Sequence, residues 1–265
     1  MRAQAEGQSI DPKAKGGVYA VRKHNKKDRI LKVPMLSHMF KSSFFFLAVA
    51  LYFSLEDSIP TPSQEAVFIK ILPIVSLAAF VVLHSLASGK LANFSVGILC
   101  GLVLSGIGDY YLVYKTTHFL HGLASFAVAQ LIYAVTFGLR PFKPVILLVC
   151  SVVALSMYTY LFPGLKGIHV VSIFIYMIVI YYMAWRALAR CQFVEGNWTW
   201  GQLLCALGSV SFLISDFVIG VDLFRYDVPH RSFIVMVTYY LAQFGITMAV
   251  TDYPSMDEIK MKKAK

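Results

Sequence analysis

Two aspartates stand inside long apolar stretches of this 265-residue chain, Asp109 and Asp216. An ionisable side chain within a bilayer-spanning helix is energetically expensive, and it indicates a functional site by default. Two carboxylates that share a site of low dielectric constant do not both ionise easily, so one of them can hold a proton near neutral pH. The pair could therefore act as a general acid and a general base.

The residues alone leave three interpretations of this pair open. Asp109 and Asp216 could form structural hydrogen bonds or ion pairs, they could bind a coupling ion or proton in a transporter, or they could be catalytic. The spacing of the two residues does not separate these interpretations.

Neighbouring apolar stretches carry polar side chains that could reach the carboxylates. Gln130 and Tyr133 are three residues apart, as are Tyr240 and Gln243. Residues at this spacing share one face of a helix. Buried Gln and Tyr side chains need hydrogen-bonding partners, and the two carboxylates could supply them. We therefore predict these four residues as part of a substrate-binding site.

Three further charged or titratable residues lie near the predicted helix ends. His121 and Arg231 are expected on the same membrane face as the carboxylates. We predict both as substrate-binding residues that could bind a lipid phosphate, although either could simply lie at the interface. His121 could also be a partner for Asp109. Arg186, near the opposite face, is expected to snorkel to the membrane surface. The histidines do not have the spacing of a metal motif, so we expect neither a metal nor another cofactor.

The composition is that of an integral membrane protein. The chain is 58% hydrophobic and only 14% charged, whereas soluble domains carry roughly 25% charged residues. Turn-forming residues divide it into about eight apolar stretches, each near the ~20 residues that cross a bilayer. We predict an all-α polytopic membrane bundle with helices at about 37–55, 66–87, 92–114, 119–139, 143–162, 167–189, 200–221 and 231–251.

Basic residues are concentrated in the two ends of the chain. We predict a basic tail at 1–34, an eight-helix domain at 35–251 and a second basic tail at 252–265. The excess of Lys and Arg over alternate loops predicts that both tails are cytosolic. The bilayer is the expected partner of this charge, because no aromatic or glycine pattern of a nucleic-acid-binding protein accompanies it.

Small residues precede both aspartates at helical spacing. Gly101 and Gly108 come before Asp109, and Gly208 comes before Asp216 at the same separation as Gly101 from Asp109. Small residues let membrane helices approach each other closely, so these faces are expected to point into the bundle. The similar surroundings also suggest two four-helix halves.

Several short segments together resemble one family of membrane proteins. These segments are Gly108-Asp109-Tyr110-Tyr111-Leu112, Phe119-Leu120-His121-Gly122-Leu123-Ala124-Ser125-Phe126 with Tyr133, Trp185-Arg186-Ala187, Phe212-Leu213-Ile214-Ser215-Asp216, and Tyr239-Tyr240-Leu241-Ala242-Gln243. In this order they resemble the YhhN family, over roughly residues 66–250.

This resemblance implies an activity. Animal members of the family are lysoplasmalogenases, eight-helix proteins of the endoplasmic reticulum that cleave the vinyl ether bond of lysoplasmalogens to a fatty aldehyde and glycerophosphoethanolamine or glycerophosphocholine. Asp109 and Asp216 match the family's expected active-site positions. The alternatives are an ion-coupled transporter or lipid carrier, and a hydrolase of ester or amide lysolipids.

Overall fold

The structure is a computed structural model that describes residues 42–88, 92–191 and 198–252. The chain divides into two units, residues 1–43 and 44–265, and the fold below is that of the second. The predicted tails 1–34 and 252–265 lie outside the described residues, apart from Asp252.

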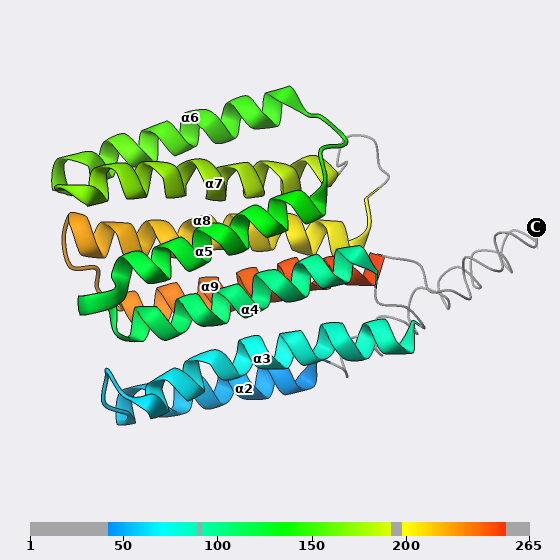
Figure 1. Ribbon diagram of the computed structural model, residues 1–265, viewed down its shortest axis with the longest axis horizontal. Coiled ribbons are helices and arrows are strands. Elements are labelled where there is room, and N and C mark those ends of the chain that lie inside the picture. Colours follow the sequence, from blue (N-terminus) through cyan, green and yellow to red (C-terminus); the bar gives the residue numbers. More distant parts are fainter. Residues whose placement is uncertain (1–41, 89–91, 192–197, 253–265) are drawn as a thin grey trace, which may run out of the picture. The chain divides into compact units, whose positions relative to one another are not determined.

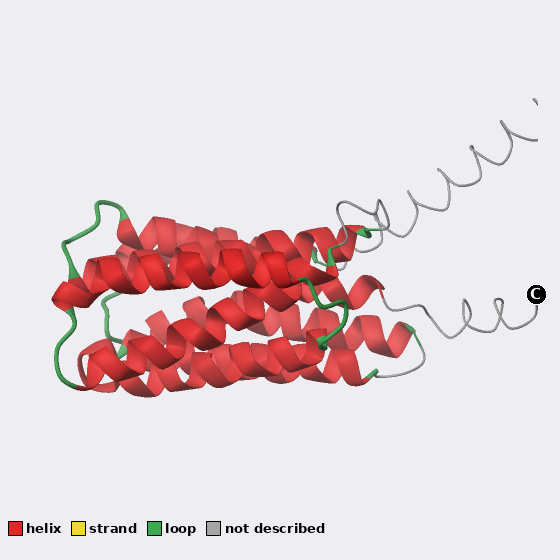
Figure 2. Ribbon diagram, turned by 90° about the horizontal axis from the view of Figure 1, so that it is seen from above, coloured by secondary structure: helices red, strands yellow, loops and turns green. Residues whose placement is uncertain are grey.

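The described part of the chain is helical and contains no strand (Figures 1 and 2). Seven of its helices are long and apolar enough to cross a membrane, and a shorter helix, α2, precedes them. The predicted all-α bundle is therefore confirmed. The helices are α2 (Ser43–Leu55), α3 (Gln64–Ala87), α4 (Asn93–Val113), α5 (Lys115–Phe137), α6 (Pro144–Leu161), α7 (Ile168–Arg190), α8 (Trp200–Phe224) and α9 (Arg231–Met248), with short 3-10 helices at Glu56–Ser58, Phe162–Gly164 and Ala249–Asp252.

Local sequence fixes several of the helix starts. The Ser63 hydroxyl accepts the Ala66 amide at the start of α3. Thr199 and Gln202 form a capping box at the start of α8. Pro144 occupies the first turn of α6, where its missing N–H costs nothing. The predicted start of the first helix at residue 37 lies outside the described residues.

The connections between α2 and α3, α4 and α5, α6 and α7, and α8 and α9 lie together at one end of the bundle, on the left in Figure 1. We call this the carboxylate end, because α4 and α8 both finish there shortly after their aspartates. Asp109 is four residues from the end of α4, and Asp216 is eight from the end of α8. At ~1.5 Å per residue, both lie within about 12 Å of that end.

Glycines let the central helices approach closely, as the sequence predicts. A Cβ on Gly101 would overlap the Tyr133 ring, so α4 and α5 touch there. A Cβ on Gly208 would lie 2.8 Å from the carbonyl oxygen of Ala242, and Gly245 faces Gly208 across the α8–α9 contact. These close approaches turn the aspartate-bearing faces of α4 and α8 toward other helices rather than toward lipid.

The helix contacts repeat in a way that supports two halves. Helix α4 packs against α3 and α5, and α8 packs against α7 and α9. Between the halves, α5 contacts α7 and α9 contacts α3. Exchanging α3–α5 for α7–α9 thus reproduces these contacts, whereas the packing of α6 on α7 has no counterpart of similar extent between α2 and α3. Helices α2 and α3 lie on one side of the four central helices and α6 and α7 on the other (Figure 1).

Arg186 does not snorkel, so that prediction is wrong. Its side chain is fully buried. Its Nε donates to the Gly138 carbonyl at 2.5 Å, its Nη1 donates to the Pro141 carbonyl at 3.1 Å, and its guanidinium lies over the Trp185 ring. The turn between α5 and α6 exposes carbonyl groups that a helix would satisfy internally, and this cation pairs with them instead of reaching the surface.

Candidate active site

A cavity of about 70 Å³ lies among the helices toward the carboxylate end, and both aspartates line it. Its walls come from α3 to α9 and are mostly apolar, including Leu112, Phe126 and Met177. Since about 10–15 Å³ is enough for one water, the cavity can hold several water molecules or part of a lipid chain.

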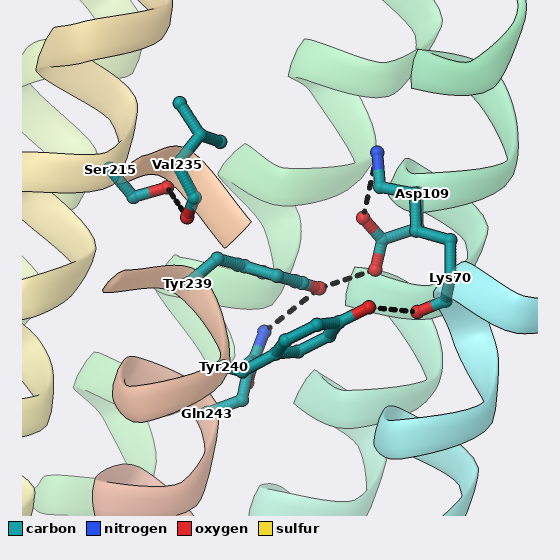
Figure 3. A network of polar contacts seen from close by, with 7 residues as sticks. All are labelled: Lys70, Asp109, Ser215, Val235, Tyr239, Tyr240 and Gln243. Atoms are coloured by element: carbon teal, nitrogen blue, oxygen red, sulfur yellow. Dashed lines mark hydrogen bonds and ion pairs between the residues drawn. The ribbon is translucent and has the colours of Figure 1, made fainter. Parts of the chain in front are cut away.

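Asp109 has two polar partners, which Figure 3 shows. The Lys70 Nζ from α3 lies 3.5 Å from its Oδ1. The Tyr239 hydroxyl from α9 donates to its Oδ2 at 2.5 Å. Only 2% of the Asp109 side chain and 16% of the Lys70 side chain are exposed. Because both groups are largely shielded from water, the cation directly favours the ionised form of this carboxyl group.

A hydrogen-bond chain leads from α5 to Asp109. The Tyr133 hydroxyl donates to Gln243 Oε1 at 3.0 Å, and Gln243 Nε2 donates to the Tyr239 hydroxyl at 3.4 Å. The Tyr239 hydroxyl then donates to Asp109. All four side chains are buried. The chain fixes the orientation of the Tyr239 hydroxyl, since Gln243 supplies a donor and leaves its proton for the carboxylate.

Two further bonds hold the helices around this network (Figure 3). The Tyr240 hydroxyl donates to the backbone carbonyl of Lys70 at 2.9 Å, which ties α9 to α3. The Ser215 hydroxyl donates to the Val235 carbonyl at 3.2 Å, which ties α8 to α9 next to Asp216. The positions of Lys70 and Asp216 are thus set by bonds to α9.

Asp216 has a different environment. The Tyr176 hydroxyl from α7 donates to its Oδ2 in a short hydrogen bond. No ion pair to Asp216 exists among the described residues. Tyr239 lies four residues before Gln243, and the corresponding position before Gln130 is Phe126, which cannot donate. The two halves therefore give one carboxylate a cation and a phenol, and the other a phenol alone.

The family model for the YhhN family matches residues 65–250. The chain belongs to this family. The relatives include "Lysoplasmalogenase TMEM86A" of Bos taurus, 34% identical over 223 residues that cover 83% of this chain and 93% of the relative. "Lysoplasmalogenase TMEM86B" of Sus scrofa is 35% identical over 212 residues, covering 80% and 87%. No solved structure matches the chain significantly.

Some of the other residues predicted for the site contact the carboxylate network in the structure, and others do not. Tyr133, Tyr240 and Gln243 belong to the network around Asp109. Gln130 is fully buried, and neither atom of its amide makes a hydrogen bond with the described residues. His121 is exposed on α5 and packs against Tyr111 and His118 rather than lining the cavity.

Arg231 lies outside the cavity as well. It begins α9 at the carboxylate end, and its Nε lies 2.9 Å from Asp222 Oδ2. It lines a second, more polar pocket, described below.

Three residues that contact the carboxylates were missed from the sequence. Lys70 lies two turns inside α3 and within the predicted helix 66–87. A lysine within the run 66–75 of otherwise apolar residues was the available signal. Tyr176 carried none, because tyrosine is common in the apolar stretches of this chain, whereas Tyr239 belongs to one of the segments that resemble the YhhN family.

The described residues contain no cluster of three or more His, Cys, Asp or Glu side chains that could hold a metal ion. The polar residues that line the cavity are two aspartates, a lysine, three tyrosines and a serine. This set can donate a proton, accept one and stabilise a cation. It offers proton-transfer chemistry in a mostly apolar setting.

Proposed function

We propose that this chain hydrolyses the vinyl ether bond of lysoplasmalogens, releasing a fatty aldehyde and glycerophosphoethanolamine or glycerophosphocholine. The printed names of its relatives support this activity. The observation that carries it is the pair of carboxyls, Asp109 and Asp216, which line one mostly apolar cavity. An alkenyl chain can lie against such walls while its reactive end meets the carboxyls.

Vinyl ether hydrolysis needs an acid and a base at one place. Protonation of the outer alkene carbon gives an oxocarbenium ion, which water then attacks to form a hemiacetal. The hemiacetal breaks down to the aldehyde and the glycerol hydroxyl. A carboxylic acid next to a carboxylate suits these steps, as in the glycosidases.

We assign the acid to Asp216 and the base to Asp109. Lys70 favours negative charge on Asp109, and two carboxylates that share a mostly apolar cavity resist ionising together. The proton of the pair therefore resides on Asp216, whose Oδ2 accepts the Tyr176 hydroxyl and whose Oδ1 is left to carry it. The negative Asp109 also stabilises the oxocarbenium ion.

The proton balance closes over one cycle. Asp216 gives its proton to the alkene carbon, and Asp109 takes a proton from the attacking water. As the hemiacetal breaks down, protonated Asp109 gives its proton to the departing glycerol oxygen, and Asp216 takes the proton of the hemiacetal hydroxyl. One water is consumed and both carboxyls return to their starting states.

The test uses the purified full chain in lipid nanodiscs, with an alkenyl lysophospholipid and its acyl counterpart as substrates. Aldehyde release from the alkenyl substrate alone supports the proposal, with Asp109→Asn and Asp216→Asn each lowering kcat by about 10²–10⁴. Full activity in either variant would overturn the catalytic assignment. Release of fatty acid from the acyl substrate would instead indicate an ester hydrolase. An inactive chain that moves lipid or ions across the bilayer would indicate the transporter.

We also propose in which membrane the chain lies and how it is oriented there. It is a multi-pass protein of the endoplasmic reticulum with both termini in the cytosol, since basic residues concentrate at the ends of the chain. The carboxylate end then faces the lumen. Tags on either terminus should be digested by protease added to intact microsomes, and protection of a tag would refute this orientation.

A further inference from the structure

A second pocket, of about 390 Å³, opens at the carboxylate end of the bundle. It is lined by residues of the α2–α3 connection, by α3, by the α4–α5 junction and by the ends of α8 and α9. It shares wall residues with the cavity of the carboxylates, among them Lys70, Leu112 and Phe119. The two spaces are therefore neighbours, one mostly apolar and the other polar.

The polar pocket contains charges of both signs. Lys70, Lys115 and Arg231 supply the cations, and Glu56 and Asp57 supply the anions. The anions sit together in the 3-10 helix that follows α2. Glu56 accepts a hydrogen bond from the Ser232 hydroxyl, so the acidic residues lie beside the start of α9.

Lys115 is the cation of this pocket that has no ion pair among the described residues. Lys70 is held by Asp109, and Arg231 by Asp222 at 2.9 Å. Lys115 is partly buried at the start of α5, within electrostatic reach of both other cations and of Asp222. Because Asp109 and Asp222 offset the charges of Lys70 and Arg231, Lys115 is the cation left to pair directly with a bound anion.

We propose that this pocket binds the zwitterionic head group of the lysophospholipid, with Lys115 as the main phosphate ligand and Glu56 and Asp57 facing the ammonium group. The inference rests on the proposed function and extends it. In the substrate, a short glycerol bridge joins the vinyl ether oxygen to the phosphate, so the two must bind in adjoining spaces. The shared wall at Lys70 provides this arrangement, with the reacting bond in the apolar cavity and the phosphate in the polar pocket.

The pocket would select substrates by their phosphate. A lysine ammonium and a phosphate form a charge-assisted hydrogen bond, which is stronger than a neutral one. Arg231 adds positive potential, while its own bond to Asp222 holds it in place. An alkenylglycerol without phosphate would gain nothing from Lys115.

The test measures binding with two ligands that cannot be hydrolysed, 1-alkyl-glycerophosphoethanolamine and 1-alkylglycerol, to the full chain in nanodiscs. Lys115→Met should weaken binding of the phospholipid by about tenfold and leave binding of the alkylglycerol unchanged, which also shows that the variant is folded. Lys115→Arg should keep most of the affinity. Lys166→Met is the matched control, because Lys166 is exposed at the same end and does not line the pocket.

Because the ligands do not react, the two proposals fail in different ways. Equal affinity of wild type and Lys115→Met for the phospholipid would overturn the head-group site. Equal loss for both ligands would do the same, since it would show a general effect on the fold. A wild-type chain that binds the phospholipid through Lys115 but releases no aldehyde from the alkenyl lipid would retain the head-group site and refute the hydrolase.

Discussion

Replacing Lys70 by methionine tests the division of roles between the two carboxyls. Methionine keeps most of the length and apolar surface of the lysine stem and removes only the ammonium group. Asp109 would then be a buried carboxyl whose remaining polar partner is the Tyr239 hydroxyl. It would stay largely protonated and could not take a proton from water.

The size of the effect follows from the geometry. Two unit charges 3.5 Å apart attract by about 5 kcal/mol at an effective dielectric constant of ~20, as an upper bound. Loss of even half of this attraction would raise the ratio of protonated to ionised Asp109 by roughly fifty-fold, because ~1.4 kcal/mol shifts an equilibrium tenfold. We therefore expect Lys70→Met to lose the general-base contribution, a fall in kcat of about 10²–10⁴.

The assay is aldehyde release from an alkenyl lysophospholipid under saturating substrate. Lys70→Arg keeps the positive charge and should retain most of the activity. Asp109→Asn and the double variant with Lys70→Met should be equally slow, because residues that act as a unit are not additive. The role of Lys70 in keeping Asp109 ionised is refuted if Lys70→Met is as fast as wild type. It is also refuted if adding Lys70→Met to Asp109→Asn lowers kcat by the same factor as Lys70→Met lowers it in the wild type.

Three further variants test other parts of the structure. Tyr176→Phe removes the hydrogen bond to the second carboxyl and should lower kcat by roughly tenfold with KM unchanged, whereas Tyr182→Phe, which does not line the cavity, should leave turnover as it is. Gly245→Val would force a side chain against a carbonyl oxygen of α8. It should cost at least ~1–3 kcal/mol of stability, measured as a lower Tm in detergent. An unchanged Tm would contradict the close contact. Arg186→Met leaves the carbonyls of the α5–α6 turn unpaired and should lower the free energy of unfolding by ~1–3 kcal/mol. The kcat per folded molecule should be preserved. A loss of kcat at unchanged Tm would mean that Arg186 has a role in the reaction.

The sequence predicts the helices well because lipid imposes a simple rule. Every backbone N–H and C=O group in the hydrocarbon must be paired within its own helix. A long apolar stretch is therefore predicted to be a transmembrane helix. The predicted 200–221 and 231–251 accordingly match α8 and α9 closely. The order of the helices also places Asp109 and Asp216 toward the same end of the bundle. Three helices separate α4 from α8, so these two helices run in the same direction.

The contacts of the site were harder to predict, because they depend on how each helix is rotated about its axis. Most of these helices are apolar around their whole circumference, so the pattern of residues does not say which face meets which neighbour. Lys70 illustrates this, because only the packing of α3 against α4 turns its ammonium group toward Asp109. Arg186 illustrates the converse, a charge expected at the surface that the α5–α6 turn encloses.

The amino-acid sequence by itself determined the membrane class, the helices and the presence of two aspartates within them, because these depend on local hydrophobicity and on the cost of a charge in lipid. Only the tertiary structure decided that the aspartates differ. Among the residues that the structure describes, Lys70 and Tyr239 reach Asp109 from α3 and α9, while Tyr176 alone reaches Asp216 from α7. The protonation of a carboxyl group depends on charges and donors within a few ångströms of it, and those neighbours come together only when distant segments pack.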